Sequence, residues 1–245
     1  MARSIVITGA SSGIGAACAR RFISNGWQVA LLARSGDRLA RIAQDHPDAV
    51  PLQCDVTRED DVEQAFETAR QRLGRIDVLF NNAGWMPQAA LIDEITLDDW
   101  QAALAVNLTG MFLCARAAFG AMRTQTPQGG RIINNGSVSA QAPRPGSLLY
   151  STTKHAVTGL TRTLALDGRA FDIGCGQIDI GNARTELTDG IGAGALQPDG
   201  SRRAEPMMDL DDVVEAVRYM AGLPLSANVL NMTVMATAAP LVGRG

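Results

Sequence analysis

Tyr150 and Lys154 are the two residues whose types and spacing most clearly suggest chemistry. Of the 22 lysine and arginine residues in the chain, Lys154 is the single lysine, and Tyr150 is one of two tyrosines. In a helix, residues four positions apart lie on one face, so the phenol and the ammonium point the same way. An ammonium is a compact charge and a guanidinium a wide planar fork, so they are not interchangeable at a tight site. The pair predicts a site with a compact cation beside a phenol; a surface lysine spared by chance is the alternative.

A glycine-rich turn near the N-terminus predicts a nucleotide site. Residues 8–15 read T-G-A-S-S-G-I-G and follow a short apolar run. Gly9 permits a tight turn, Gly13 lets the backbone approach a pyrophosphate, and Gly15 allows close packing of helix on strand. The following helix would present its N–H groups and positive dipole end to the phosphates. The other turn residues predicted to contact the nucleotide are Ser11, Ser12 and Ile14.

The choice of cofactor depends on the end of the second apolar run. No carboxylate stands at Ala33, where one would bind the ribose 2′-hydroxyl of NAD. Arg34 instead offers a guanidinium fork suited to a 2′-phosphate, which predicts NADP(H) in preference to NAD(H). Stacking of Arg34 on the adenine ring is the alternative. Asp55, after the third run, is expected to accept a hydrogen bond from the adenine amino group.

Composition excludes several classes of protein. A chain of 245 residues with 46% hydrophobic content can form one substantial domain, here taken as residues 1–245. A net charge of −3 argues against a nucleic-acid partner. Four cysteines without C-x-x-C spacing indicate small buried apolar residues, and two histidines give little material for a metal site, so we expect no metal.

The N-terminal apolar run is too short for the core of a signal peptide. No uninterrupted apolar run reaches the roughly 18 residues that indicate a membrane span. The sequence therefore predicts a cytoplasmic protein with no membrane partner.

Short apolar runs alternate with longer helical patterns along the whole chain, which predicts a doubly wound α/β fold of the Rossmann type. Its central seven-stranded parallel sheet would carry helices on both faces. The expected strands are Ile5–Thr8, Val29–Ala33, Val50–Cys54, Val78–Phe80, Ile132–Asn135, Ile173–Ile178 and Val229–Met235. The expected helices are Gly13–Asn25, Arg38–Asp45, Arg58–Leu73, Leu97–Arg123, Leu148–Asp167 and Asp211–Gly222.

The segment 181–208 interrupts this alternation. It is rich in Gly, Asp and Pro, and it contains the pair Met207-Met208. A loop of this length in a compact domain is usually a lid or a binding loop, so we expect it to bind substrate. A disordered surface excursion is the alternative.

Over essentially its whole length the chain resembles the classical short-chain dehydrogenase/reductase family. T-G-x-x-x-G-I-G at residues 8–15 is joined by N-N-A-G at residues 81–84 and by Y-x-x-x-K at residues 150–154. Ser137 lies 13 residues before the tyrosine, as in the family, and Asn107 matches an asparagine that kinks a long helix. Five motifs in the right order are a specific signal.

The resemblance implies hydride transfer between nicotinamide C4 and a carbonyl or alcohol carbon. Tyr150 would then be the acid/base, Ser137 would orient the substrate oxygen, and Lys154 would hold the nicotinamide ribose. Asn107 would bind a water that links Lys154 to solvent, or serve only as a structural kink. Further cofactor contacts implied by the matching motifs fall at Val56, Asn82, Ala83, Gly84, Gly181, Ala183 and Thr185.

The tyrosine and lysine are expected to work as a pair. A phenol has an ordinary pKa of about 10, and lowering it to about 7 needs roughly 4 kcal/mol in favour of the phenolate. An ammonium about 4 Å away supplies on the order of 4 kcal/mol at an effective dielectric constant near 20. The positive charge of an oxidised nicotinamide would add to this, and desolvation would oppose it.

Two stretches depart from the family pattern. Ile180 stands where the family usually has proline, while Gly181 and Thr185 fit. The stretch 229–245 lacks the usual paired glycines and ends in an apolar tail, which we expect to pack against a neighbouring subunit in a homodimer or homotetramer.

The substrate is a small carbonyl or alcohol compound whose identity does not follow from the sequence. The residues expected to bind it are Trp85, Ser139, Gln141 and Arg144. Arg144 would recognise a carboxylate or phosphate, or it is a solvated loop residue. Two functions follow: an NADP(H)-dependent oxidoreductase, or a catalytically silent protein of this fold that senses nucleotide or binds a partner. An epimerase or dehydratase is disfavoured, because its relatives look longer.

Overall fold

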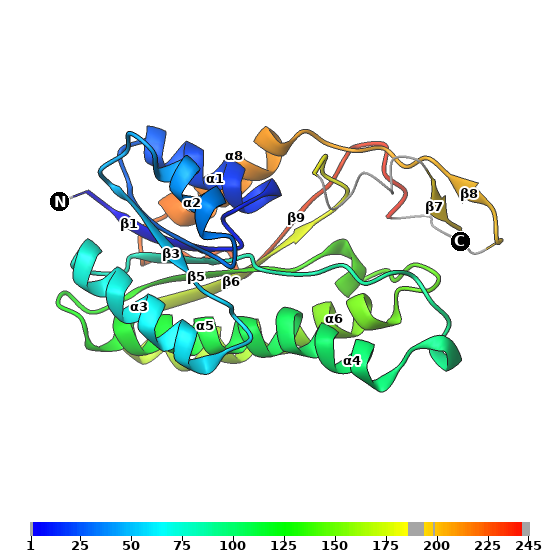
Figure 1. Cartoon of the computed structure of the whole chain (residues 1–245), viewed down its shortest axis with the longest axis horizontal. Helices are drawn as coiled ribbons and strands as arrows, with labels where there is room; N and C mark the ends of the chain where they lie inside the picture. Colours follow the sequence, from blue (N-terminus) through cyan, green and yellow to red (C-terminus); the bar gives the residue numbers. More distant parts are fainter. Residues whose placement is uncertain (1, 186–193, 198, 242–245) are drawn as a thin grey trace.

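The computed structural model describes residues 2–185, 194–197 and 199–241. Seven parallel strands form one sheet in the order β3-β2-β1-β4-β5-β6-β9, which confirms the predicted Rossmann-like α/β fold (Figure 1). The strands are β1 (Ser4–Thr8), β2 (Gln28–Ala33), β3 (Ala49–Gln53), β4 (Val78–Asn81), β5 (Gly130–Asn135), β6 (Ile173–Ile180) and β9 (Asn231–Val234).

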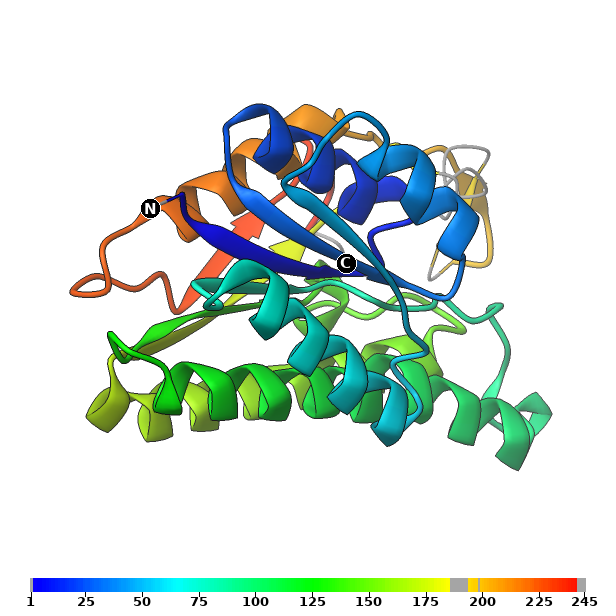
Figure 2. The same cartoon turned by 60° about the vertical axis from the view of Figure 1, so that its left-hand side comes forward.

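Helices cover both faces of the sheet, as Figures 1 and 2 show. One layer contains α1 (Gly13–Ser24), α2 (Gly36–Ala43) and α8 (Leu210–Gly222). The other contains α3 (Glu59–Leu73), α4 (Leu97–Leu104), α5 (Gly110–Thr124) and α6 (Leu148–Asp167). Short 3₁₀ turns lie at η1 (Ile92–Glu94), η3 (Val138–Ala140) and η4 (Gly168–Phe171), a π-helical turn at η2 (Ala105–Thr109), and a small hairpin at β7 (Ala195–Leu196) and β8 (Arg202–Arg203).

The core lies in two layers, one on each side of the sheet. Alternating residues of a strand face opposite sides, so Ile5 and Ile7 of β1 pack with the α1 and α8 layer, and Val6 packs with the α3 and α5 layer. Both faces of β1, β2 and β4 are buried, and this explains why these strands are largely continuous apolar runs, whereas the edge strands β3 and β9 are partly exposed. The four cysteines, as predicted, are free and buried: Cys18, Cys54, Cys114 and Cys175.

The helical run Leu97–Thr124, which comprises α4, η2 and α5, is long and apolar enough to span a bilayer, with a mean hydropathy of 1.5. The fold buries 44% of its most apolar window. Leu113, Cys114, Ala118 and Met122 are buried in the core layer beneath the sheet.

The last two strands differ from their predicted bounds. β6 continues to Ile180, two residues beyond the predicted end, and Ile180 pairs with Val234 of β9. Isoleucine favours this extension, because it is a strand former and keeps the N–H that proline lacks. β9 is shorter than the predicted strand at both ends.

The carboxyl ends of the strands meet at one edge of the sheet. The chain runs outward from β1 through β2 to β3, and then returns to the other side of β1 with β4. Such a reversal opens a crevice at the carboxyl ends of the central strands, where α/β proteins of this topology bind ligands. The predicted site residues follow these strand ends.

Candidate active site

Ser137, Tyr150 and Lys154 lie together beyond the end of β5. Ser137 begins the turn η3, and the other two project from α6. The Lys154 ammonium nitrogen lies 5.5 Å from the centre of the Tyr150 ring, as expected for residues four apart on a helix. The Ser137 hydroxyl hydrogen-bonds the phenol and accepts a bond of 3.1 Å from the N–H of Ser139. The structure therefore brings the three residues into one group.

Lys154 is a buried cation. Its side chain is 3% exposed, and its ammonium donates a hydrogen bond of 2.7 Å to the carbonyl of Asn135. Burial lowers the pKa of Lys154 to about 8, because an ammonium loses hydration there, and the nearby Asp179 carboxylate opposes this decrease. The interpretation of Lys154 as a surface lysine is therefore wrong.

Burial dominates the ionisation of Tyr150. It raises the pKa of the phenol, the hydrogen bond from Ser137 and the charge of Arg144 lower it, and the charge of Asp179 raises it further. The expected decrease toward neutrality is thus not produced by the residues of this chain alone. Desolvation has the largest effect on the pKa of Tyr150. The expected gain from an ammonium about 4 Å away did not include the size of this effect.

Asn107 lies in the π-helical turn η2, between α4 and α5, so the helical run is irregular at the position where a kink was predicted. Its side-chain amide makes two hydrogen bonds of 2.7 Å with the backbone of Trp85, one to the carbonyl and one from the N–H. It also donates a bond of 3.4 Å to Thr153, whose hydroxyl bonds the carbonyl of Tyr150. Asn107 therefore joins the chain after β4 to the helix that carries Tyr150.

The three glycines of the first turn are required by close approaches. Gly9 and Gly13 have φ of +67° and +51°, in the region that favours glycine. A Cβ at Gly15 would lie 2.2 Å from the carbonyl oxygen of Gly9. Ser12 precedes α1 and makes no capping hydrogen bond, so the first N–H groups of α1 face the crevice without a side-chain cap. This cradle fits a dinucleotide pyrophosphate, with Ser11 and Ile14 in the turn.

The segment Asn82–Gly84 supports this turn from beneath. The N–H groups of Asn82 and Ala83 each donate a bond of 2.9 Å to the Thr8 hydroxyl, and the Asn82 amide donates one of 3.0 Å to the Thr8 carbonyl. Gly84 lies close to Asn107, because a Cβ there would be 3.5 Å from its side-chain oxygen. These bonds fix the ends of β1 and β4 relative to each other.

Three residues at the ends of β2 and β3 occupy the predicted adenine side of the crevice. Arg34 directly follows β2 and is exposed. Asp55 is partly buried, and one of its carboxylate oxygens accepts both bonds from Thr57, at 3.0 and 2.8 Å. Val56 is buried and touches the position where Gly110 would carry a Cβ, at 2.8 Å. Arg34 and Asp55 therefore lie just beyond the carboxyl ends of the neighbouring strands β2 and β3.

The chain after β6 crosses the nucleotide cradle. The methyl group of Thr185 lies 3.4 Å from where a Cβ would stand at Gly13. Ala183 is buried and forms a parallel bridge with Met208, at the far end of the lid. Gly181 donates its N–H to the Val234 carbonyl at 2.8 Å. Gly181, Ala183 and Thr185 thus lie at the crevice despite the missing proline. Part of the predicted lid, residues 186–193 and 198, lies outside the described residues.

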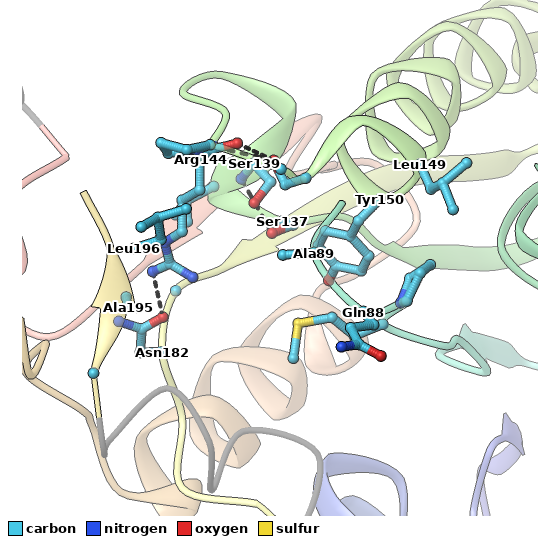
Figure 3. A pocket seen from close by; sticks show the side chains of 18 of the residues that line it. Gln88, Ala89, Ser137, Ser139, Arg144, Leu149, Tyr150, Asn182, Ala195 and Leu196 are labelled. Atoms are coloured by element: carbon cyan, nitrogen blue, oxygen red, sulfur yellow. Dashed lines mark hydrogen bonds between the residues drawn. The ribbon is translucent and has the colours of Figure 1, made fainter. Parts of the chain in front are cut away.

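A pocket of about 310 Å³ opens beside Tyr150 (Figure 3). This volume is at the small end of the range for small-molecule sites. Ser137, Ser139, Arg144 and Tyr150 line it, together with Ala195 and Leu196 of the lid hairpin. The other apolar lining residues are Met86, Pro87, Ala89, Val138, Pro145, Leu149 and Ile180. The remaining polar ones are Gln88, Ser147, Asn182 and Arg202.

Arg144 is paired with the lid, so the interpretation of it as a solvated loop residue is wrong. Its guanidinium donates to Asn182 at 2.8 Å and forms an ion pair with Glu205, a side chain that is 3% exposed. Asn182 also donates to Glu205, at 2.8 Å. A carboxylate of the chain itself therefore already occupies Arg144, which weakens the expectation that it recognises an anionic substrate.

Two predicted substrate residues do not line the pocket. Trp85 is 36% exposed and lies outside it, and its backbone N–H is bound by Asn107. The Gln141 amide points away, donating to Asp179 at 3.0 Å and to Thr233 at 3.3 Å. Sequence reasoning assigned no role to three buried polar residues of the site: Asp179, Asn182 and Glu205. The one available signal was Asp179, the single charged residue of the strand β6.

Comparison with known proteins gives the class. The sequence profile described as short chain dehydrogenase matches residues 3–195. The chain is 36% identical to an uncharacterized oxidoreductase of Staphylococcus saprophyticus, over 92% of each chain. It is 32% identical to a 3-oxoacyl-[acyl-carrier-protein] reductase of Synechocystis sp., over 95% of this chain and 94% of that one.

Solved structures agree. A 3-ketoacyl-(acyl-carrier-protein) reductase from Brucella melitensis, complexed with NADH, superposes with a TM-score of 0.84 at 25% identity, covering 96% of this chain and 98% of that one. An alcohol dehydrogenase from Thermococcus sibiricus, complexed with 5-hydroxy-NADP, gives 0.82 at 26% identity, with 97% and 98% covered. The chain belongs to the short-chain dehydrogenase/reductase family. It is an oxidoreductase of the class that acts on CH–OH groups.

Proposed function

We propose that the protein interconverts a carbonyl compound and a secondary alcohol, with Tyr150 as the acid/base and NADP(H) as the preferred cofactor. The observation that carries the proposal is the Ser137–Tyr150–Lys154 group: Ser137 and Tyr150 line the pocket, and the buried Lys154 lies next to the Tyr150 ring. The bound nicotinamide nucleotide supplies the exchange of hydride. The residues of the chain bind and orient the substrate and exchange the proton.

Ser137 and Tyr150 are placed to bind the reacting oxygen. Both line the pocket, and their hydroxyl groups are already hydrogen-bonded to each other. An oxygen bound between them is oriented by Ser137 and exchanges a proton with Tyr150. A positive charge near the phenol favours the phenolate, so the Lys154 ammonium, and an oxidised nicotinamide when bound, would oppose the burial that raises the pKa of Tyr150.

The preference for NADP(H) rests on Arg34. Its guanidinium is exposed at the end of β2, where Ala33 provides no carboxylate to bind a ribose hydroxyl. The solved relatives include one complexed with NADH and one with an NADP derivative, so the family fold accepts both. The residues of this chain favour the phosphorylated form.

The pocket supports a mainly apolar, uncharged substrate. Apolar atoms form most of its lining surface. Of its two arginines, Arg144 is neutralised by Glu205 and Arg202 donates to the Gly194 carbonyl at 3.2 Å. A relative of this chain acts on 3-oxoacyl groups, whose carbonyl is uncharged. We expect uncharged ketones and aldehydes to turn over faster than keto acids of similar size.

The test is consumption of NADPH, and then of NADH, against a panel of ketones and aldehydes. Tyr150→Phe should lose at least about 100-fold in turnover and retain nucleotide binding, because general acid/base catalysis contributes about 10²–10⁴-fold. Arg34→Leu should weaken NADPH binding by about 10–100-fold and leave NADH binding unchanged. Arg20→Leu, an exposed arginine of α1, is the matched control.

Near-normal turnover in Tyr150→Phe would contradict the proposed mechanism. Equal loss of NADPH and NADH binding in Arg34→Leu would contradict the cofactor preference. Tight NADPH binding with no turnover on any compound would favour a nucleotide-sensing protein.

A further inference from the structure

Asp179 is a buried carboxylate at the centre of the site, and the chemistry described above does not use it. It lies in β6, one residue before the strand ends, and is 1% exposed. Burying a carboxylate is costly unless hydrogen bonds or a partner charge compensate. Because this cost is incurred next to Ser137, Tyr150 and Lys154, we expect the Asp179 carboxylate to have a role in the site.

Four N–H groups point at the Asp179 carboxylate, two at each oxygen. Oδ1 accepts from the backbone N–H of Ser137 at 2.9 Å and from the Gln177 amide at 2.7 Å. Oδ2 accepts from the side-chain amides of Gln141 and Asn231, each at 3.0 Å. An ionised carboxylate only accepts hydrogen bonds, so this pattern of donors matches the charged form.

These bonds connect the elements that carry the reacting groups. Ser137 and Gln141 belong to the loop after β5, and Asn231 belongs to β9. Gln177 also donates to Thr158 of α6 at 3.1 Å, and α6 carries Tyr150. The carboxylate therefore lies between the serine loop, the catalytic helix and the last strand.

Gly136 leaves room for the Asp179 carboxylate next to the backbone. A Cβ at Gly136 would lie 2.1 Å from the Asp179 Oδ1 atom, so only glycine fits between Asn135 and Ser137. Asn135 provides the carbonyl that binds Lys154. The same short stretch of chain thus contacts Asp179, holds Lys154 and presents the Ser137 hydroxyl.

We propose that Asp179 is a positioning residue that holds Ser137 in place and supplies a fixed negative charge beneath the Tyr150–Lys154 pair. The charged and titratable groups that face it are Tyr150 and Lys154 from α6, with Arg144 acting on the phenol from the loop after η3. Its partners from β6 and β9, Gln177 and Asn231, are uncharged. This inference rests on the proposed role of Tyr150 as the acid/base.

The sign of the effect is fixed by electrostatics. A negative charge disfavours a phenolate and favours an ammonium, so Asp179 raises the pKa of Tyr150 and that of Lys154. Without that charge both pKa values decrease. A pH–rate profile limited by these two groups then moves to lower pH on both limbs, whereas a purely structural loss lowers the rate at every pH.

Asp179→Asn removes the charge with little change of shape. The remaining carbonyl oxygen still accepts from Ser137 and Gln177. The new amide faces the side chains of Gln141 and Asn231, and these can rotate to present their own carbonyl oxygens.

The experiment uses the fact that the chain has only two tyrosines, Tyr150 and Tyr219. In a Tyr219→Phe background, ultraviolet phenolate absorbance reports Tyr150 alone. The titration is made with and without NADP⁺, over the pH range in which far-ultraviolet circular dichroism shows folded protein. Asp179→Asn should lower the midpoint by about half a pH unit or more.

Asp77→Asn is the matched control, because Asp77 is a partly buried carboxylate that precedes β4, at the opposite edge of the sheet. An unchanged or higher midpoint in Asp179→Asn, or an equal shift in Asp77→Asn, would overturn the inference. If Asp179→Asn does not fold, Asn231→Lys introduces a cation beside the carboxylate from an exposed position and should lower the midpoint in the same way. If the parent protein does not bind NADP⁺, the proposed function is contradicted. The role of Asp179 is still tested in that case, because the titration is also made without nucleotide.

Discussion

Replacing Lys154 with methionine should stabilise the fold at neutral pH while it disables the site. The buried ammonium has a pKa of about 8, against an ordinary value of 10.5. The unfolded chain therefore holds the lysine proton more tightly than the folded chain does. By linkage, this costs the folded state about 3 kcal/mol near pH 7, where the ammonium is charged in both states.

The cost disappears as the pH rises. Between pH values of about 8 and 10.5 the folded protein has released the proton and the unfolded chain still holds it, so stability increases with pH. From about pH 7 to about pH 10 the parent protein should gain roughly 2–3 kcal/mol relative to Lys154→Met. Loss of the hydrogen bond to Asn135 adds a constant offset that does not change with pH.

The assay is urea unfolding of both proteins at several pH values, with the two free energies of unfolding subtracted at each pH. Ionisations that the Lys154 charge does not perturb cancel in this difference. If the difference in unfolding free energy stays constant from pH 7 to pH 10, the pKa of Lys154 is not shifted by burial. If the parent protein instead becomes less stable relative to Lys154→Met as the pH rises, the pKa of Lys154 is raised in the folded state, not lowered.

Two further predictions concern the frame of the site. Gly15→Ala should weaken NADP⁺ binding by about tenfold or more, because its Cβ would lie 2.2 Å from the Gly9 carbonyl oxygen. Binding is measured by fluorescence titration. The control Gly120→Ala should bind NADP⁺ normally, because a Cβ there would have no atom within 4 Å. Equal binding by both variants would contradict the close packing of the turn. Asn107→Ala should cost about 2–3 kcal/mol of unfolding free energy, since it leaves the Trp85 N–H and carbonyl without their partner. Urea unfolding checks this, and a loss no larger than that of the exposed Asn25→Ala would contradict it.

Local patterns were sufficient for the fold and for the catalytic group. The central strands could be predicted because burial on both faces makes them apolar runs. The four-residue spacing of Tyr150 and Lys154 correctly predicted that they lie on one face of a helix. The kink predicted at Asn107 followed from its match to the family pattern, and the helical run is irregular there, as a π-helical turn.

The pocket depended on contacts between distant segments, which spacing does not reveal. Gln141 was expected to face the substrate and instead binds Asp179, which lies 38 positions further along the chain. Arg144 was expected either to recognise an anionic substrate or to be solvated, and it is paired with Glu205 from the lid. The raised pKa of Tyr150 required the desolvation of its ring, which depends on the packed structure rather than on the Tyr150–Lys154 spacing.

The bridge between Ala183 and Met208 fixes both ends of the lid at one point. The N–H of Met208 donates to Asn182 at 2.9 Å, and the N–H of Arg184 donates to Met208 at 3.1 Å. A segment whose ends are already joined can change in length at small entropic cost, about 0.6 kcal/mol for each doubling. Thr185 and Glu205 lie just inside these anchors, where Thr185 approaches Gly13 and Glu205 pairs with Arg144. A change of length that spares both residues is therefore expected to leave the nucleotide cradle and the Arg144 ion pair intact.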